Sequence, residues 1–359
     1  MVNWAELNQD LLSLIGKKLD FREDFNAFGR VCKSWRSVAV KENFRGSQQI
    51  PWLMLAEAEE EEKGDKNNSA TADERRFVSV KGGDMIGKLM LPEARGKRCL
   101  ETRGWLVTIS ENSEMNLLHP ISRVQIALPS MTTLDHYEDG SMFNNFIYVQ
   151  KAVLSSCPSG SNNYVLMIIH EGRGFLGYWR CGDKAWTTIQ TRFGAFRDIT
   201  YYKGQFYAVN TSGKVFVCDI ERDPTRAHAV GGAPDEIVPW IQTERHPYIV
   251  EWEGNLLIVV RDGFMLKYVG SMAWNPSKGD NALFLGDNAS ISVRAAALLG
   301  IKPNCIYYTD DCWPAYIEFK RGGGRDMGIY NLADGSQTPY FKGESFSSIC
   351  PPLWVRPYF

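Results

Sequence analysis

Apolar positions in the first forty residues recur with the period of a helix. Every fourth residue is apolar in one run, which consists of Leu7, Leu11, Ile15 and Leu19. A second run continues at three- and four-residue steps, with Phe25, Phe28, Val31, Trp35 and Val38. Both runs are typical of helices with one apolar face. We therefore predict a small unit of about three helices over residues 1–45.

This helical unit has more apolar side chains than it can bury. Leu12 and Leu14 flank the first run and widen its apolar face. A module of about forty residues leaves a large share of its surface exposed to solvent. The surplus apolar side chains must therefore contact the rest of the chain or another protein.

From residue 76 onward the pattern changes to short apolar runs between turn residues, which is typical of β-strands. Three segments share a turn glycine, an apolar strand, a polar turn and a second strand, and they begin at Gly104, Gly204 and Gly254. With weaker members included, the repeats start near residues 52, 104, 164, 204, 254 and 304, a spacing of about 40 to 60 residues. This spacing matches one propeller blade.

The whole chain is thus predicted to be an α+β multidomain protein. The helical unit at 1–45 precedes an all-β propeller of about six blades over residues 50–359, and a split β-sandwich is the competing fold. The segment 57–74 is rich in glutamate and poor in apolar residues. It predicts a mobile acidic loop inserted between two strands, with a regulatory acidic segment as the alternative.

Composition excludes several classes of protein. Of 359 residues, 44% are hydrophobic and the net charge is −2, so a large core is expected and a broad basic surface for nucleic acid is not. The sequence shows no signal-peptide pattern and no apolar run of about 20 residues, so no membrane association is expected. Its eight cysteines form no Cys-x-x-Cys pair. They predict reduced thiols and a location in the cytoplasm, the nucleus or both.

One short motif tests for a nucleotide-binding enzyme. Gly172, Gly174 and Gly177 have the spacing of the dinucleotide fingerprint. That fingerprint needs a helix after the last glycine, because free N–H groups at the helix start bind the pyrophosphate. Aromatic residues and Gly182 follow here instead, so we predict a hairpin turn. The three glycines at 322–324 likewise predict a flexible turn.

No other pattern indicates catalysis, a metal or a cofactor. The five histidines lie far apart and show no metal-ligand spacing. Asp310 and Asp311 are adjacent, so in a strand they would face opposite sides and could not act as an acid–base pair. We interpret them as loop residues. The sequence therefore predicts a protein that is not an enzyme and that has no metal site and no cofactor.

The helical unit resembles an F-box. The similarity includes the run Val31, Cys32, Lys33, Trp35 and Arg36 and the apolar positions before it. Two positions depart from the usual pattern: Asn8 stands where the family has proline, and Gly16 stands where it has a bulky apolar residue. Asn8 still suits a helix N-cap.

The rest of the chain resembles the plant F-box proteins that carry a KIB-type β-propeller. The most specific stretches are 304–311, which contains Tyr307, Tyr308 and Thr309, and 351–355, which contains Trp354. The resemblance extends over most of residues 50–359. It supports the propeller in preference to the sandwich.

This resemblance implies the substrate-recognition subunit of an SCF-type cullin-RING ubiquitin ligase. The F-box would bind a Skp-type adaptor, and through it the cullin and RING subunits, with contacts from Leu7, Leu11, Ile15, Leu19, Phe25, Phe28, Val31 and Trp35. The propeller would bind a protein substrate, with Trp240, Trp274 and Trp313 as candidate contacts because they lie in turn-rich segments. The alternative is an interaction protein outside any ligase, whose propeller binds a protein or a small ligand.

Overall fold

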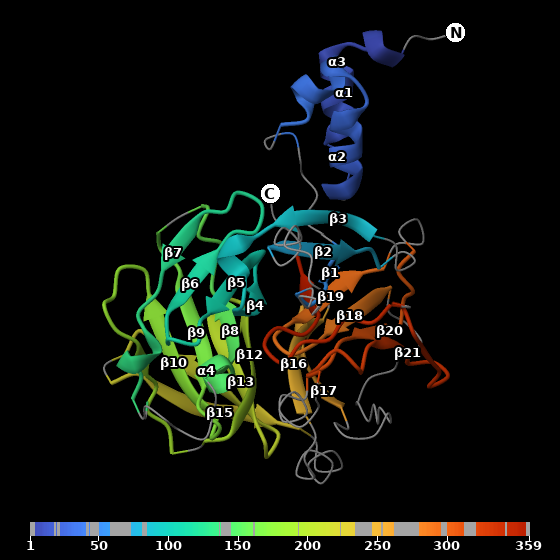
Figure 1. Cartoon of the computed structure of the whole chain (residues 1–359). Helices are drawn as coiled ribbons and strands as arrows, with labels where there is room; N and C mark the ends of the chain where they lie inside the picture. The colour runs from blue at the N-terminus through green and yellow to red at the C-terminus, as the bar shows by residue number, and fades with distance from the viewer. Residues whose placement is uncertain are drawn as a thin grey trace, which may run out of the picture. The chain divides into compact units, whose positions relative to one another are not determined.

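A computed structural model gives the fold (Figure 1). It describes residues 4–17, 19, 22–40, 43, 50–57, 73–80, 85–135, 137, 145–160, 162–192, 194–222, 224–233, 246–252, 254–261, 280–295, 300–311, 321–341 and 343–356. The chain divides into two compact units. One comprises Met1–Pro51 with Arg356–Tyr358, and the other comprises Trp52–Val355 with Phe359.

The described part of the first unit is helical. It contains the 3-10 helix η1 (Trp4–Glu6) and the helices α1 (Gln9–Gly16), α2 (Arg22–Arg30) and α3 (Lys33–Val38). Asn8 caps α1, because its side-chain oxygen accepts a hydrogen bond of 2.9 Å from the backbone N–H of Asp10. A Cβ at Gly16 would lie 3.2 Å from the ring of Phe25. The glycine therefore permits the close approach of α1 and α2.

The second unit consists of antiparallel sheets joined in chain order. Its strands are β1 (Trp52–Met54), β2 (Glu74–Val78), β3 (Met85–Met90), β4 (Arg98–Thr102), β5 (Trp105–Ile109), β6 (Met115–Leu118), β7 (Gln125–Ala127), β8 (Val149–Leu154), β9 (Val165–His170), β10 (Phe175–Arg180), β11 (Thr187–Thr188), β12 (Phe196–Tyr202), β13 (Gln205–Asn210), β14 (Lys214–Asp219), β15 (Arg226–Gly232), β16 (His246–Trp252), β17 (Asn255–Arg261), β18 (Asn281–Leu285), β19 (Ser290–Arg294), β20 (Cys305–Tyr308), β21 (Gly328–Asn331), β22 (Gln337–Thr338) and β23 (Leu353–Val355). The short helices η3 (Pro92–Ala94), η4 (Met131–Thr133) and α4 (Asn145–Tyr148) lie between strands.

These sheets form an all-β propeller (Figure 1). One end strand of each sheet packs on that of the next, which gives the series β23, β4, β8, β12, β16 and β19. Four sheets have four strands: β23-β1-β2-β3, β4-β5-β6-β7, β11-β10-β9-β8 and β12-β13-β14-β15. A fifth, β19-β18-β20-β21-β22, has five strands and includes one parallel pair, β18 with β20. The predicted propeller is confirmed.

The predicted number of about six blades is corrected by one. Five full blades are found in the described residues, and β16 with β17 forms a further sheet of two strands. Within the described residues, the repeat that starts at Gly254 supplies β17, which pairs with the preceding strand β16. Its predicted second strand at 263–267 lies outside the described residues. The prediction counted one blade for each repeat start, and it therefore gave this repeat the same weight as those that form full blades.

The last strand of the propeller pairs with the first. Leu53 of β1 lies opposite Trp354 of β23. Trp354 also stacks edge-on against Phe284 of β18, with ring centroids 5.0 Å apart, and its indole N–H donates to the carbonyl of Leu285 at 3.1 Å. This one side chain therefore joins the first blade to the five-stranded blade and closes the ring.

The turn predictions have mixed outcomes. Gly174 has a positive φ of 67° in the turn between β9 and β10, where Phe175 pairs with His170. The hairpin predicted from the glycine motif is confirmed. The turn at 322–324 is not a loose one, because Gly323 pairs with Ser347 and a Cβ at Gly324 would overlap the carbonyl oxygen of Ser345.

Candidate functional site

Side chains of the first unit separate into a buried core and an exposed apolar set. Leu12, Phe28 and Val38 form the core, and Leu7, Ile15, Leu19, Trp35 and Ala39 pack partly buried against it. The Trp35 ring lies 4.7 Å from that of Phe28, and its N–H donates to the carbonyl of Trp4 at 2.9 Å. Trp35 thereby attaches η1 to α3.

The eight predicted adaptor contacts therefore do not form one exposed face. Leu11 and Val31 are 50% and 58% exposed, whereas Phe25 and Phe28 are buried at 2% and 5%. The side chains of Leu7, Ile15, Leu19 and Trp35 are half-buried. Three further exposed apolar residues were not among the predictions: Trp4, Leu14 and Val40. The fourfold spacing grouped Leu11 with Ile15, but helix packing buries Leu12 in place of Leu11.

The predicted substrate contacts Trp240, Trp274 and Trp313 lie outside the described residues. Of the acidic loop predicted at 57–74, residues 58–72 also lie outside them. The two ends of that segment are structured, because Glu57 forms an ion pair with Arg75 and Glu74 begins β2.

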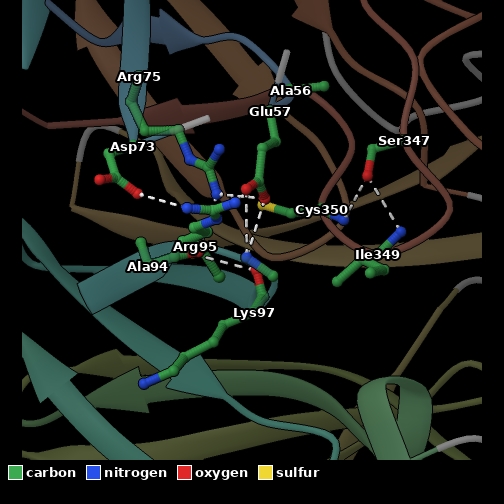
Figure 2. A network of polar contacts seen from close by, with 12 residues as sticks. Ala56, Glu57, Asp73, Arg75, Ala94, Arg95, Lys97, Ser347, Ile349 and Cys350 are labelled. Atoms are coloured by element: carbon green, nitrogen blue, oxygen red, sulfur yellow. Dashed lines mark hydrogen bonds and ion pairs between the residues drawn. The ribbon is translucent and has the colours of Figure 1, made fainter. Parts of the chain in front are cut away.

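The ion pair of Glu57 belongs to a polar network in the first blade (Figure 2). The guanidinium of Arg75 lies 3.0 Å from the Glu57 carboxylate and donates to the carbonyl of Ala94 at 2.8 Å. The Arg75 side chain is 1% exposed. Glu57 also accepts a hydrogen bond from the backbone N–H of Gly96 at 3.0 Å. The carboxylate thus neutralises a buried charge and fixes the turn before β4.

Replacing Glu57 with glutamine is expected to reduce the free energy of unfolding by about 2–3 kcal/mol, because the Arg75 charge would remain buried without its counter-ion. Chemical denaturation of the propeller, followed by tryptophan fluorescence, measures this change. The matched control is Glu344→Gln, since the pair of Glu344 with Arg321 is exposed at both ends. That control should change stability by less than about 1 kcal/mol. Equal effects of the two substitutions would contradict the assignment.

A second polar cluster lies where inner strands of neighbouring blades begin. Asp198 at the start of β12 is fully buried, and its carboxylate lies 3.2 Å from the Lys151 ammonium of β8. It accepts hydrogen bonds of 2.8 Å from the backbone N–H of Ile249 on β16 and from the hydroxyl of Ser290 on β19. One carboxylate therefore connects four sheets of the propeller.

Arg261, at the end of β17, is the second centre of this cluster. Its side chain is 2% exposed, lies 2.9 Å from an oxygen of the Asp311 carboxyl group, and forms an ion pair with Asp326. Burial, and next the charge of Asp326, raise the pKa of Asp311 to about 8. Asp310 accepts from the backbone N–H of Gly324 at 2.7 Å. Both aspartates follow β20 outside any strand, as predicted for loop residues, but both are buried.

Two basic side chains of the cluster have fewer polar partners than Lys151 and Arg261. Arg197 is half-buried, and within the described part of the chain no carboxylate is paired with it. Burial lowers its pKa. The Nε2 atom of His246 is buried and has no hydrogen-bond partner among the described residues. Burial and the nearby charges of Lys151, Arg197 and Arg261 hold the pKa of His246 well below its usual value.

Sequence reasoning missed the charged residues of this cluster. A signal was present, because Lys151, Arg197 and Asp198 interrupt runs that are otherwise apolar. Charged residues are almost never fully buried without partners. His246 and Arg261 face each other in the β16–β17 hairpin, and the tertiary fold brings Lys151 and Asp198 to them from two other sheets.

Other concave or acidic features are satisfied internally. A pocket of about 280 Å³ is lined in part by Asp219 and Glu221, and these carboxylates pair with Arg222 and Arg180. Among the described residues, no group of three or more His, Cys, Asp or Glu side chains is placed to hold a metal ion. The described helices include none with the length and apolar character needed to span a membrane.

Comparison with known proteins gives a family and several relatives. The model of the KIB1-4 beta-propeller family matches residues 77–331. The F-box protein SKIP23 of Arabidopsis thaliana is 28% identical over 244 residues, which cover 61% of this chain and 56% of that protein. The putative F-box protein At3g25750 of the same plant is 23% identical, with 93% of each chain covered. The F-box/kelch-repeat protein At3g18720, also from Arabidopsis thaliana, is 24% identical and covers 85% of this chain and 78% of its own.

Proposed function

Because this chain belongs to the KIB1-4 beta-propeller family, we propose that it is the substrate-recognition subunit of an SCF-type cullin-RING ubiquitin ligase. Its helical unit would bind a Skp-type adaptor, and its propeller would bind a protein substrate. Relatives named F-box proteins, one of them matched over 93% of both chains, support this role.

The observation that carries the proposal is the exposed apolar set of the helical unit. Leu12, Phe28 and Val38 already fill its core, while Leu11 and Val31 are half or more exposed. Burying one such side chain against a partner stabilises a complex by about 1.5–3 kcal/mol. A unit this small gains nothing from exposed leucine unless a partner covers it.

Exposure also divides the predicted adaptor contacts by role. Leu11 and Val31 would contact the adaptor directly, together with Leu14. Leu7, Ile15, Leu19 and Trp35 would present only their outer atoms, because they pack against the core of the unit. The buried rings of Phe25 and Phe28 would support this surface from inside.

The proposed role is recruitment, with no reaction performed by the chain itself. A receptor that holds a substrate near a charged conjugating enzyme raises the effective concentration of the substrate's lysines at that enzyme. Such a role needs two binding surfaces on one chain. The exposed apolar set and the propeller would supply them.

Leu11→Arg is expected to weaken capture of the adaptor and cullin by about 100-fold. The variant loses an apolar contact and would place a charge in the interface. Co-expression of the full chain with adaptor, cullin and RING subunit, followed by affinity capture, measures the loss.

The control for this experiment is Val124→Arg, which changes an apolar side chain of similar exposure, 51%, in the propeller. It should leave capture unchanged. The thermal transition of the propeller should be the same in both variants. Full capture by a folded Leu11→Arg protein would reject the ligase role and favour an interaction protein that works outside the ligase.

A further inference from the structure

In the cluster at the start of the inner strands, one basic side chain is not paired with any acidic side chain of the described residues. Lys151 is paired with Asp198, and Arg261 is paired with Asp326. Arg197 has no such partner among the described residues. We call Lys151, Arg197, His246 and Arg261 the axial basic cluster.

The axial basic cluster comes from four neighbouring strands, β8, β12, β16 and β17. Arg197 precedes Asp198, whose carboxylate pairs with Lys151 and accepts from the backbone N–H of Ile249 on β16. His246, at the start of β16, lies opposite Arg261 of β17. The Lys151 ammonium is buried and, apart from its ion pair with Asp198, makes no hydrogen bond within the described residues. It lies 5.4 Å from the centroid of the Tyr248 ring, which in turn lies 4.7 Å from the ring of His246. Asp198 and Asp326 already pair with Lys151 and Arg261, so Arg197 is the basic side chain whose charge an added anion would neutralise.

The backbone is also irregular at these positions. The register of β8 with β9 shifts between Val149 and Lys151, and that of β12 with β13 shifts between Phe196 and Asp198. Such bulges redirect side chains and occur often beside functional sites. Two neighbouring blades thus carry the same irregularity where they supply Lys151, Arg197 and Asp198.

We propose that the axial basic cluster binds a small oxyanion, the phosphate or carboxylate end of a small molecule, with Arg197 as its main ligand. A guanidinium presents two parallel N–H donors, which match two oxygens of such a group. His246 Nε2 and the Lys151 ammonium, both buried and without a hydrogen-bond partner among the described residues, are the further candidate donors. This proposal goes beyond ligase recruitment and does not depend on it.

The stability of the free protein distinguishes a binding role from a structural one. A half-buried charge without a partner is unfavourable, so its removal should not harm the free protein. We expect Arg197→Gln to have the same melting temperature as the wild type, or a higher one, in chloride buffer. An arginine that served only to hold the fold would give the opposite result.

Binding is tested on the full chain with sodium phosphate and with sodium acetate, each at constant ionic strength adjusted with sodium chloride. For the wild type we expect a saturable rise in melting temperature with at least one of the two anions, and broadening of the phosphorus resonance if phosphate binds. Arg197→Gln should weaken the apparent affinity at least tenfold, and Arg197→Lys should weaken it less. The two anions decide between a phosphate and a carboxylate ligand.

The matched control is Arg173→Gln, which removes an arginine whose side chain is 81% exposed. It should bind the anion as the wild type does. The proposal is overturned if neither anion gives a saturable effect beyond that of chloride, if Arg197→Gln binds as tightly as the control, or if Arg197→Gln lowers the melting temperature in chloride buffer.

Discussion

Replacing Asp198 with alanine is expected to lower the free energy of unfolding of the propeller by about 3–5 kcal/mol, because it leaves the Lys151 ammonium buried without a counter-ion. Lys151 is 1% exposed and Asp198 is fully buried. The substitution also removes the acceptor for Ile249 and Ser290, which lie on two other sheets. Unfilled donors of this kind add to the loss.

Chemical denaturation monitored by tryptophan fluorescence measures this effect. Asp219→Ala is the control, because the Asp219 side chain pairs with a largely exposed arginine, Arg222, and its loss should cost no more than about 1 kcal/mol. The double variant Asp198→Asn with Lys151→Met should recover part of the stability, since it removes both buried charges together. A loss below about 1 kcal/mol for Asp198→Ala would show that Asp198 does not join the blades.

The second large effect concerns pH. Since the pKa of Asp311 is about 8 in the folded protein, the side chain is protonated at neutral pH when folded and ionised when unfolded. The unfolded state therefore binds fewer protons between pH about 4 and 8. In that range this residue should reduce the free energy of unfolding by about 1.4 kcal/mol per pH unit as the pH rises. Above pH 8 its contribution should be constant.

Unfolding free energies measured from pH 5 to 9 test this expectation. Asp311→Asn should make the decrease of the unfolding free energy with pH smaller by about 1.4 kcal/mol per pH unit, because an amide does not titrate and one fewer proton is released on unfolding. Asp326→Asn should lower the upper end of the pH range in which stability falls, since the Asp326 charge helps to raise the pKa of Asp311. Arg261, Lys151 and Asp310 are the other charged groups around this site. An unchanged slope in Asp311→Asn would contradict the assignment.

Local patterns were sufficient for the type and order of the elements. The fourfold spacing from Leu7 to Leu19 and the later steps from Phe25 to Trp35 predicted helices, and α1, α2 and α3 lie in this part of the chain. The hairpins after Gly104 and Gly204 were confirmed as β5 with β6 and β13 with β14. Turn glycines and apolar runs specify these elements because their hydrogen bonds join residues close in sequence.

The number of blades and the buried face of helix α1 were predicted less well. Spacing gave about six blades where five full ones are found in the described residues, among which one repeat contributes a single strand to a two-stranded sheet. Spacing also grouped Leu11 with Ile15 on one apolar face, although the structure buries Leu12, leaves Ile15 half-buried and exposes Leu11. A helix turns by 100° per residue, so a shift of one position changes which side chains face the core.

The amino-acid sequence determined the kinds of elements, their order and the family resemblance, since each of these depends on residues that are neighbours along the chain. Only the tertiary structure decided which charges meet. Lys151, Asp198 and Arg261 come from three different sheets, and Trp354 closes the ring over a separation of 69 residues from Leu285. The contribution of these charges to stability then depends on burial, because a charge removed from water is stable only with the partners that folding brings to it.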